Sequence, residues 1–483
     1  PIGHTPRKTM HRLRLRSGWS RQVPATCTHE VTGSFATIST HSVDRRYRYR
    51  SAPDRSTTDK LEAMSDTSQR SIAASVGLVT AGSMVANICA YLVHVPAGRW
   101  LGASAYGEFA VLMAAMLVLA VPALALQAVV ARDMVHGRPV RALIRLTMLV
   151  TAVVAALMVP AVPLFMWLAD TGVATTVAGL AAAPVLVLIA GAQGVLQGGR
   201  AFPALATVLA GVGVLRSVPV VVALACGGGA GTGLAAGTAG AIAAAGAAWL
   251  MVGSGLLRES HPGEAASGAG ALSVIRASQV QFVLVVAVSL DLLVSRGVLG
   301  ADDAGVYALG AVATKAAFWL PQAIGVVVYP ALADPTTSRR SLGHAVRVVA
   351  LVGAVLTVGA GCAGPLVPLV FSDDYRPLVP ILWIFAFTGS TLAVLQVTLL
   401  WAIARDRTRV AVFTWAALAV EGTLILAVAD SVLSLALVAT SAAAAATGAT
   451  VLWVWRAHLE TTGPAAPGAA EDSAVAAETV ADQ

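Results

Sequence analysis

The sequence consists mainly of long apolar runs separated by short polar segments. From Ser71 onward each run lasts about twenty residues, the length that an α-helix needs to cross the roughly 30 Å hydrocarbon core of a membrane. The twelve runs lie at 72–95, 108–131, 146–169, 174–197, 202–225, 231–257, 277–299, 305–331, 348–371, 377–404, 410–429 and 432–455. The pattern predicts an all-α integral membrane protein with about twelve transmembrane helices.

The second half of these runs repeats the first. Leu101–Ala110 aligns without gaps on Leu299–Ala308, with Leu, Gly, Ala, Gly, an aromatic residue and Ala in the same places. Arg99 and Arg296 precede the two blocks, one position out of register. Six spans per half is an even number, so both halves enter the membrane from the same side. We therefore expect two parallel-repeat six-helix bundles with a substrate path between them.

Polar stretches set the expected domain boundaries. A basic N-terminal extension holds thirteen Lys and Arg against six acids and has no long apolar run, and Met64 is a candidate for the natural start. The tail is rich in Ala, Pro and Glu, and both ends are expected to be disordered. The boundaries are 1–70 for the extension, 71–257 for the first bundle, 258–276 for a cytoplasmic linker, 277–456 for the second bundle and 457–483 for the tail.

The distribution of arginines between the loops predicts the orientation. Basic loops face the cytoplasm. The basic side contains Arg132, Arg138, Arg141, Arg145, Arg200, Arg258, Arg276, Arg339, Arg340, Arg347, Arg405, Arg407, Arg409 and Arg456. The opposite side holds only Arg99, Arg296 and Arg376, next to several aspartates. We expect a multi-pass plasma-membrane protein with both termini in the cytoplasm.

Composition excludes several other classes. The chain is 57% hydrophobic and only 12% charged, against about 25% charged residues in a soluble domain. The net charge of +7 comes mostly from residues that flank membrane spans, so it does not indicate nucleic acid. The four cysteines form no CxxC or Cys/His spacing, and Gly227–Gly233 is an outer turn without the context of a nucleotide loop. We expect no metal, no cofactor and no ATP hydrolysis.

Several short blocks resemble a known family. The blocks are Arg99–Gly102, Tyr106–Phe109, Ala304–Tyr307, Lys315 and Leu320–Pro321. Across residues 71–456 they resemble the polysaccharide transporter branch of the superfamily of multidrug/oligosaccharidyl-lipid/polysaccharide exporters. This resemblance implies a flippase that moves polyprenyl-diphosphate-linked sugars to the outer face of the membrane by alternating access. It also implies a V-shaped pair of bundles around a central cationic cavity, in a monomer that could work beside polysaccharide synthesis machinery.

Six residues are candidates for substrate binding because a diphosphate needs cations and a sugar needs hydrogen bonds. They are Arg99, Arg296, Lys315, Arg216, Gln127 and Gln322. Each has a structural alternative. The first two arginines could extend to lipid headgroups at the outer interface. Lys315 could neutralise Asp291, Arg216 could pair with Glu421, and the glutamines could join helices.

Three residues are candidates for ion coupling, namely Asp291, His94 and Glu421. A charged group in the middle of a span is costly and usually faces a partner or a wet cavity. His94 lies within one residue of Asp291 across the repeat, and a histidine titrates near neutral pH. Its alternative is a packed, hydrogen-bonded core histidine.

Four other functions are considered as alternatives to the flippase of lipid-linked sugars. A multidrug exporter of the same superfamily would favour acidic residues in its cavity, and a peptidoglycan lipid-precursor flippase typically has fourteen spans. A major-facilitator transporter is weakly suggested by Arg132-Asp133 and Arg138, although the glycine and second aspartate of that pattern are missing. A membrane enzyme would need a sizeable outer loop, and Ser372–Arg376 is the richest outer loop of the chain. The chain is therefore not expected to be an enzyme.

Overall fold

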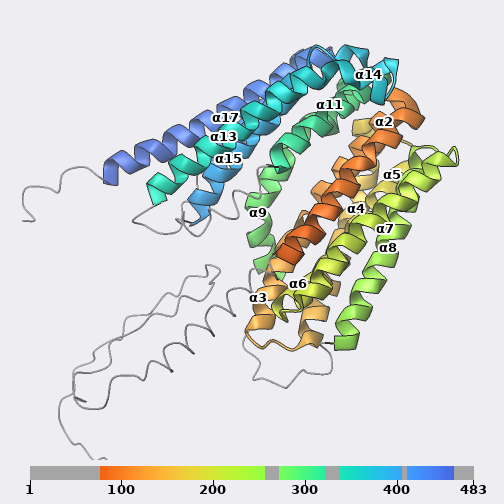
Figure 1. Ribbon diagram of the computed structural model, residues 1–483, viewed down its shortest axis with the longest axis vertical. Helices are drawn as coiled ribbons and strands as arrows, with labels where there is room; N and C mark the ends of the chain where they lie inside the picture. Colours follow the sequence, from red (N-terminus) through yellow and green to blue (C-terminus); the bar gives the residue numbers. More distant parts are fainter. Residues whose placement is uncertain (1–74, 76, 256–270, 321–337, 405–410, 462–483) are drawn as a thin grey trace, which may run out of the picture. The chain divides into compact units, whose positions relative to one another are not determined.

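The computed structural model describes residues 75, 77–255, 271–320, 338–404 and 411–461. Within these ranges every regular element is a helix (Figure 1). Among the described residues, ten helical ranges are long and apolar enough to cross a membrane, and one of them, Gly77–Val135, has 59 residues, about twice the length of a single crossing. Gly77–Val135 is long enough for two crossings, and Ala301–Trp319 is a further long helix of the described part, although it carries three charged residues. The predicted all-α membrane fold is confirmed.

The first half begins with a helix over residues 77–92. It continues with α2 (His94–Leu119), α3 (Val121–Val135), α4 (Val140–Ala169), α5 (Val173–Leu180), α6 (Ala182–Gly198), α7 (Phe202–Ala225) and α8 (Ala230–Gly255). The second half contains α9 (Ala271–Ala287), α10 (Leu290–Val298), α11 (Ala301–Trp319), α13 (Ser338–Ala363), α14 (Val367–Val370), α15 (Leu382–Ala404), α16 (Ala411–Val428) and α17 (Val432–Thr461), with the short 3-10 helices η2 (Gly364–Leu366) and η3 (Asp373–Leu378).

Several helices match the predicted spans closely, and α7 has the same limits as the predicted span 202–225. The helical hydrogen bonding is interrupted inside some of the predicted spans, although the predicted spans 174–197 and 277–299 still correspond to the continuous helical ranges Val173–Gly198 and Gln281–Val298. Three of these interruptions lie at Ala120, at Ala181 and at Val288-Ser289. A proline follows the first two within three residues, and proline cannot donate the next helical hydrogen bond. The third break has no proline and places Asp291 in the first turn of α10.

The turn between the first two spans is made inside α2. Gly102 has a φ of +72° in an otherwise helical stretch. A side chain is rarely tolerated in this left-handed region, and glycine has none. The bend falls within the segment that the sequence predicts as the loop between spans 72–95 and 108–131.

Within each half, neighbouring helices pack along most of their length. In the first half α7 contacts α8 and α3 contacts α6, and in the second half α13, α15 and α17 lie side by side (Figure 1). Small residues allow close approach, as expected for membrane helices. A methyl group at Gly240 of α8 would overlap the carbonyl oxygen of Leu215 in α7.

The two halves touch through α2 and α11, the helices that carry the repeated blocks. Gly107 of α2 lies against Gly305 of α11, and these two glycines occupy equivalent places in the repeat. Two copies of one position that meet each other indicate a local twofold relation between the halves. This contact is the structural counterpart of the sequence repeat.

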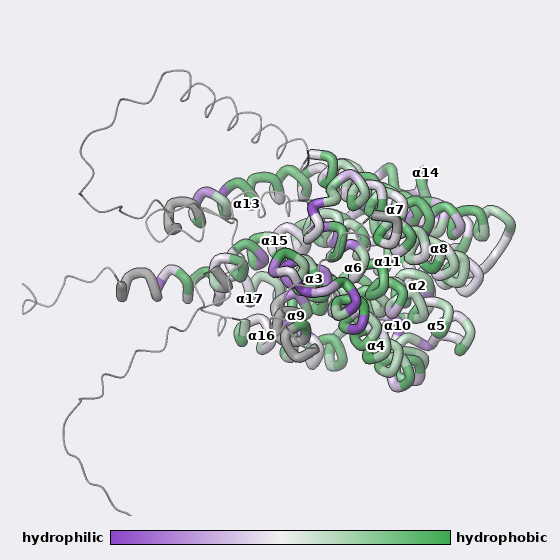
Figure 2. The backbone as a smooth tube through the Cα atoms, turned by 90° about the horizontal axis from the view of Figure 1, so that it is seen from below, coloured by the Kyte–Doolittle hydropathy of each residue, from purple (hydrophilic) through white to green (hydrophobic). Residues whose placement is uncertain are grey.

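Apolar side chains cover much of the outside of the described helices. Trp167 is 80% exposed and Leu250 is 76% exposed. Figure 2 shows that apolar positions predominate along the helices. Side chains of this kind on the outside are stable in lipid rather than in water, so the chain is a multi-pass membrane protein.

Candidate functional site

A cavity of about 620 Å³ lies between the helix of residues 77–92, α2, α7 and α8 of the first half and α11 of the second. Leu292 of α10 and Gln281 of α9 also reach it. Its volume falls within the range of about 300–1,000 Å³ typical of small-molecule sites. The wall is largely apolar, with a few polar and charged side chains.

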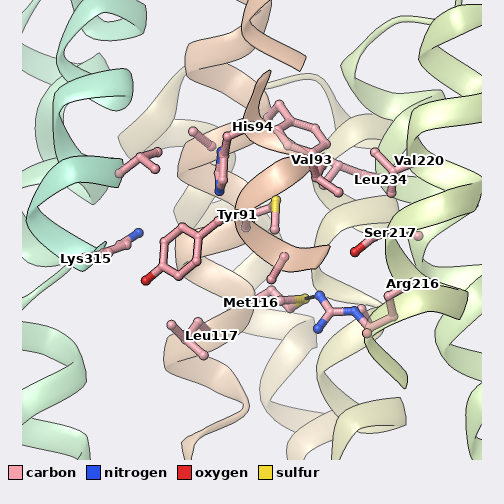
Figure 3. Close-up of a pocket in the computed structure, with 18 of the residues that line it drawn as sticks. Tyr91, Val93, His94, Met116, Leu117, Arg216, Ser217, Val220, Leu234 and Lys315 are labelled. Atoms are coloured by element: carbon pink, nitrogen blue, oxygen red, sulfur yellow. Dashed lines mark hydrogen bonds between the residues drawn. The ribbon is translucent and has the colours of Figure 1, made fainter. Parts of the chain in front are cut away.

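Two cations extend into this cavity from opposite walls (Figure 3). Lys315 comes from α11 and Arg216 comes from α7. The Arg216 Nη2 atom donates to the Met116 sulfur at 3.5 Å, which is a weak acceptor. Within the described part of the chain neither cation forms a salt bridge, and the described lining contains no Asp or Glu. The cavity therefore has an excess of positive charge.

A polar face along the continuous helical range that contains residues 77–92 and the start of α2 completes the wall. Asn87, Tyr91 and His94 follow one another at spacings of four and three residues, so they share one side of the helix, and all three line the cavity. The His94 Nδ1 atom is hydrogen-bonded to the Tyr106 hydroxyl at 3.0 Å, and the His94 ring packs edge-on against Phe109. His94 is thus both a packed core residue and a cavity residue.

The cavity is also lined by three residues that are not among the candidates from the sequence, namely Tyr91, Ser217 and Thr238. The signal for Tyr91 is its helical spacing from His94. For Ser217 it is the adjacent Arg216. Thr238 gives no comparable signal, because its hydroxyl donates to the Ala178 carbonyl as an ordinary helix-to-helix bond at 2.9 Å.

The structure places Arg99 and Arg296 away from this cavity. Arg99 is exposed. Arg296 donates from Nε to the Ala169 carbonyl at 2.7 Å and from Nη1 to the Ser104 carbonyl at 2.8 Å. Of the four candidate cations, Lys315 and Arg216 come together in one cavity.

Asp291 has Tyr307 as its hydrogen-bond partner. The Tyr307 hydroxyl donates to the Oδ2 atom of Asp291 at 2.6 Å, and Lys315 lies within electrostatic range of the carboxylate, although these two described residues form no ion pair. The Oδ1 atom is buried without a hydrogen-bond partner, as is the hydroxyl of Ser289. A buried polar group that lacks a partner is costly, so this cluster can accept a proton or a cation.

The proposed pair of Arg216 with Glu421 is wrong. Arg216 lines the large cavity, whereas Glu421 lies in α16 beside a separate small void that Thr414 also lines. Glu421 is only 4% exposed and lies within electrostatic range of Asp291. The helices α7 and α16 occupy equivalent places in the two halves, but this equivalence did not imply a contact between Arg216 and Glu421.

The two glutamine candidates do not add to the cavity. The Gln127 amide donates to the side-chain oxygen of Gln197 at 3.1 Å, which links α3 to α6. This is the alternative in which a glutamine joins two helices. Gln322 lies outside the described residues, as does most of the predicted linker 258–276.

The fold is that of solved transporters. An inward-facing multidrug resistance MATE family transporter of the MOP superfamily overlaps with a TM-score of 0.60 at 14% identity, over 79% of this chain and 96% of that chain. The lipid II flippase MurJ in an inward closed conformation overlaps with a TM-score of 0.58 at 11% identity, over 78% and 87%. An outward-facing MATE family transporter gives 0.51 at 15% identity, over 80% and 97%. The chain shares their fold.

Neither protein-family models nor curated proteins match this sequence. At 11–15% identity the likeness to these transporters concerns the fold alone. It argues against the major-facilitator alternative, whose resemblance rested on Arg132, Asp133 and Arg138. In the structure Asp133 accepts from Arg138 at 2.8 Å and from Arg132 at 3.4 Å, which is a local cap between α3 and α4.

Proposed function

We propose that this protein is a membrane transporter that flips a polyprenyl-diphosphate-linked oligosaccharide from the cytoplasmic to the outer face of the plasma membrane by alternating access. The observation that carries the proposal is the charge of the cavity. Lys315 and Arg216 face it from the two halves, and no carboxylate is found among its described lining residues. An anionic headgroup is the cargo that such a wall favours.

The chemistry of the lining fits the three parts of this cargo. Arginine can bind two phosphate oxygens with its planar fork, and lysine supplies a point charge. Asn87, Tyr91 and Ser217 provide hydrogen-bonding groups for sugar hydroxyls. The lipid tail has no counterpart in the polar part of the wall and would remain in the bilayer.

The class of cargo distinguishes the proposed function from the functions of the solved transporters that share the fold. The MATE transporters named above are multidrug transporters, and cationic drugs favour acidic cavities. The positive cavity is therefore evidence against a drug exporter. MurJ is a lipid II flippase, and lipid II shares the diphosphate, so a peptidoglycan precursor is the second candidate cargo. The predicted count of twelve spans, against a typical fourteen in such flippases, favours a different lipid-linked sugar.

We place ion coupling in the buried cluster of Asp291, Tyr307 and Glu421, with His94 as the corresponding group of the first half. The unpaired Oδ1 atom of Asp291 and the buried carboxyl of Glu421 support this assignment. Binding of a proton or a sodium ion would remove the cost of a bare buried carboxylate. Transport that responds to a pH gradient would identify the proton, and transport that responds to a sodium gradient would identify the metal ion.

A binding measurement tests the proposed cargo class. The purified protein in lipid nanodiscs is titrated with a polyprenyl-diphosphate-linked disaccharide, with the phosphate-free polyprenol and with a cationic dye. We expect saturable binding of the diphosphate lipid and at least tenfold weaker binding of the other two. Preference for the dye would contradict the proposal and favour a drug exporter.

A further inference from the structure

A set of contacts joins the two halves at the end of the molecule that the arginine distribution predicts to be outer. At its centre Gly107 of α2 meets Gly305 of α11. A methyl group at Gly107 would lie 3.0 Å from the Gly305 nitrogen, and one at Gly305 would overlap the Ala103 carbonyl oxygen. The helices can approach this closely only because neither position has a side chain.

Arg296 reinforces this crossing. Its guanidinium belongs to α10 of the second half and binds two carbonyl oxygens of the first half, those of Ala169 and Ser104. Ala169 is the last residue of α4, and the final carbonyls of a helix have no partner in their own helix. A cation at this helix end is also favoured by the helix dipole. One side chain thus fastens α10 to both α4 and α2.

Tyr375 of η3 adds a third contact at the same end. Its hydroxyl donates to the Gly98 carbonyl of α2 at 3.2 Å, and Phe371 packs against Gly98 so closely that a methyl group there would lie 2.7 Å from the ring. Burial raises the pKa of the Tyr375 hydroxyl well above its ordinary value of 10.0, and the nearby Asp374 carboxylate raises it further. The hydroxyl therefore stays a donor at physiological pH.

This outer contact is continuous with the cavity. Tyr106 is fully buried and packs edge-on against Tyr375 with ring centroids 6.2 Å apart. The same Tyr106 hydroxyl is hydrogen-bonded to His94 in the cavity wall. A change in the position of His94 would therefore displace the rings of Tyr106 and Tyr375, and so alter the outer contact.

We propose that these contacts are the outer gate of the transport cycle and that Arg296 is its latch. When the gate opens, the guanidinium releases the Ala169 and Ser104 carbonyls, and α11 moves away from α2 at Gly107. This role replaces the expected binding of substrate by Arg296. The proposal rests on alternating access and does not depend on which cargo is carried.

Cysteine labelling tests the latch without any cargo. The four native cysteines are changed to serine, and Ser217→Cys places one thiol in the cavity. A membrane-impermeant maleimide is then added from either side of vesicles. In this background we expect labelling from the cytoplasmic side and little from the outer side. With Arg296→Gln we expect outer labelling to rise at least threefold.

Arg99→Gln is the matched control, because it removes the same charge from the corresponding segment of the first half at an exposed side chain. It is expected to leave outer labelling unchanged. Arg296→Lys should give an intermediate rise, since a single ammonium does not reproduce a fork that reaches two carbonyls.

Unchanged outer labelling in Arg296→Gln, with cytoplasmic labelling intact, would overturn the latch. If that variant fails to insert, Gly305→Ala and Tyr375→Phe decide, because each weakens a different contact of the gate. If outer labelling rises in neither Gly305→Ala nor Tyr375→Phe, the proposal is also overturned. Since the assay contains no cargo, its failure is distinct from a failure of the binding experiment above.

Discussion

The side chains of Lys315 and Arg216 show what a single buried charge can predict. Their depth within apolar runs indicated that each needed a partner or a cavity. Both line the cavity, and Lys315 also lies within electrostatic range of Asp291, whereas Arg216 and Glu421 line separate cavities. Charge and depth can be read along one helix. The identity of a partner depends on how helices rotate against each other, which the sequence does not specify.

Removing either cavity cation should weaken binding of the diphosphate lipid. Hydrogen bonds to charged groups contribute about 1.5–3 kcal/mol, which corresponds to roughly 10- to 150-fold in affinity. We therefore expect at least a tenfold loss in Lys315→Gln and in Arg216→Gln, measured by titration in nanodiscs. Arg376→Gln removes an exposed charge outside the cavity and should bind normally. Equal affinity in all three variants would contradict the assignment.

The hydrogen bond from Tyr307 to Asp291 should stabilise the fold. Tyr307→Phe removes the donor and leaves both carboxylate oxygens without a partner, at a cost of about 1–3 kcal/mol. We expect a lower midpoint of thermal unfolding for the purified protein in detergent. Tyr91→Phe removes a hydroxyl that faces the cavity and serves as the matched control. A midpoint for Tyr307→Phe equal to that of the control would show that the bond contributes little.

At the scale of helices, hydrophobic length predicted where most elements begin and end. The limits of α7 agree with the prediction at both ends, because a membrane span is bounded by the change from apolar to polar residues. Length carries no information about breaks inside the apolar run. The break at Val288-Ser289 could not be predicted from proline or glycine, and it is the one that positions Asp291 at a helix start.

Two glycines of α8 should respond in opposite ways to the same substitution. Gly240 lies against the Leu215 carbonyl, so Gly240→Ala forces α7 and α8 apart and should lower thermal stability. Gly246 has nothing within 4 Å of the position of a Cβ atom, so Gly246→Ala should stabilise the helix by about 0.5–1 kcal/mol. Thermal unfolding of the two variants in detergent measures both effects. Destabilisation of equal size in both would contradict the packing described here.

At the scale of the whole molecule, the repeat was the most informative feature of the sequence. Blocks of ten residues predicted two related halves, and the contact of Gly107 with Gly305 is the physical expression of that relation. The repeat did not predict which residues of each half form the contacts between the halves. Arg296 links the two halves through two hydrogen bonds while Arg99 is exposed, so arginines only one position out of register in the repeat have different contacts.

The central claim is that the positive cavity between the halves carries the headgroup of a diphosphate-linked sugar across the membrane. The most direct measurement is transfer of a fluorescent polyprenyl-diphosphate disaccharide between leaflets of proteoliposomes, followed by quenching from one side. We predict that the wild-type protein moves the lipid well above the rate of protein-free vesicles and that a double variant with Lys315→Gln and Arg216→Gln does not. Transfer at the wild-type rate by the inserted double variant, or no transfer by the wild-type protein under any ion gradient, would contradict the account.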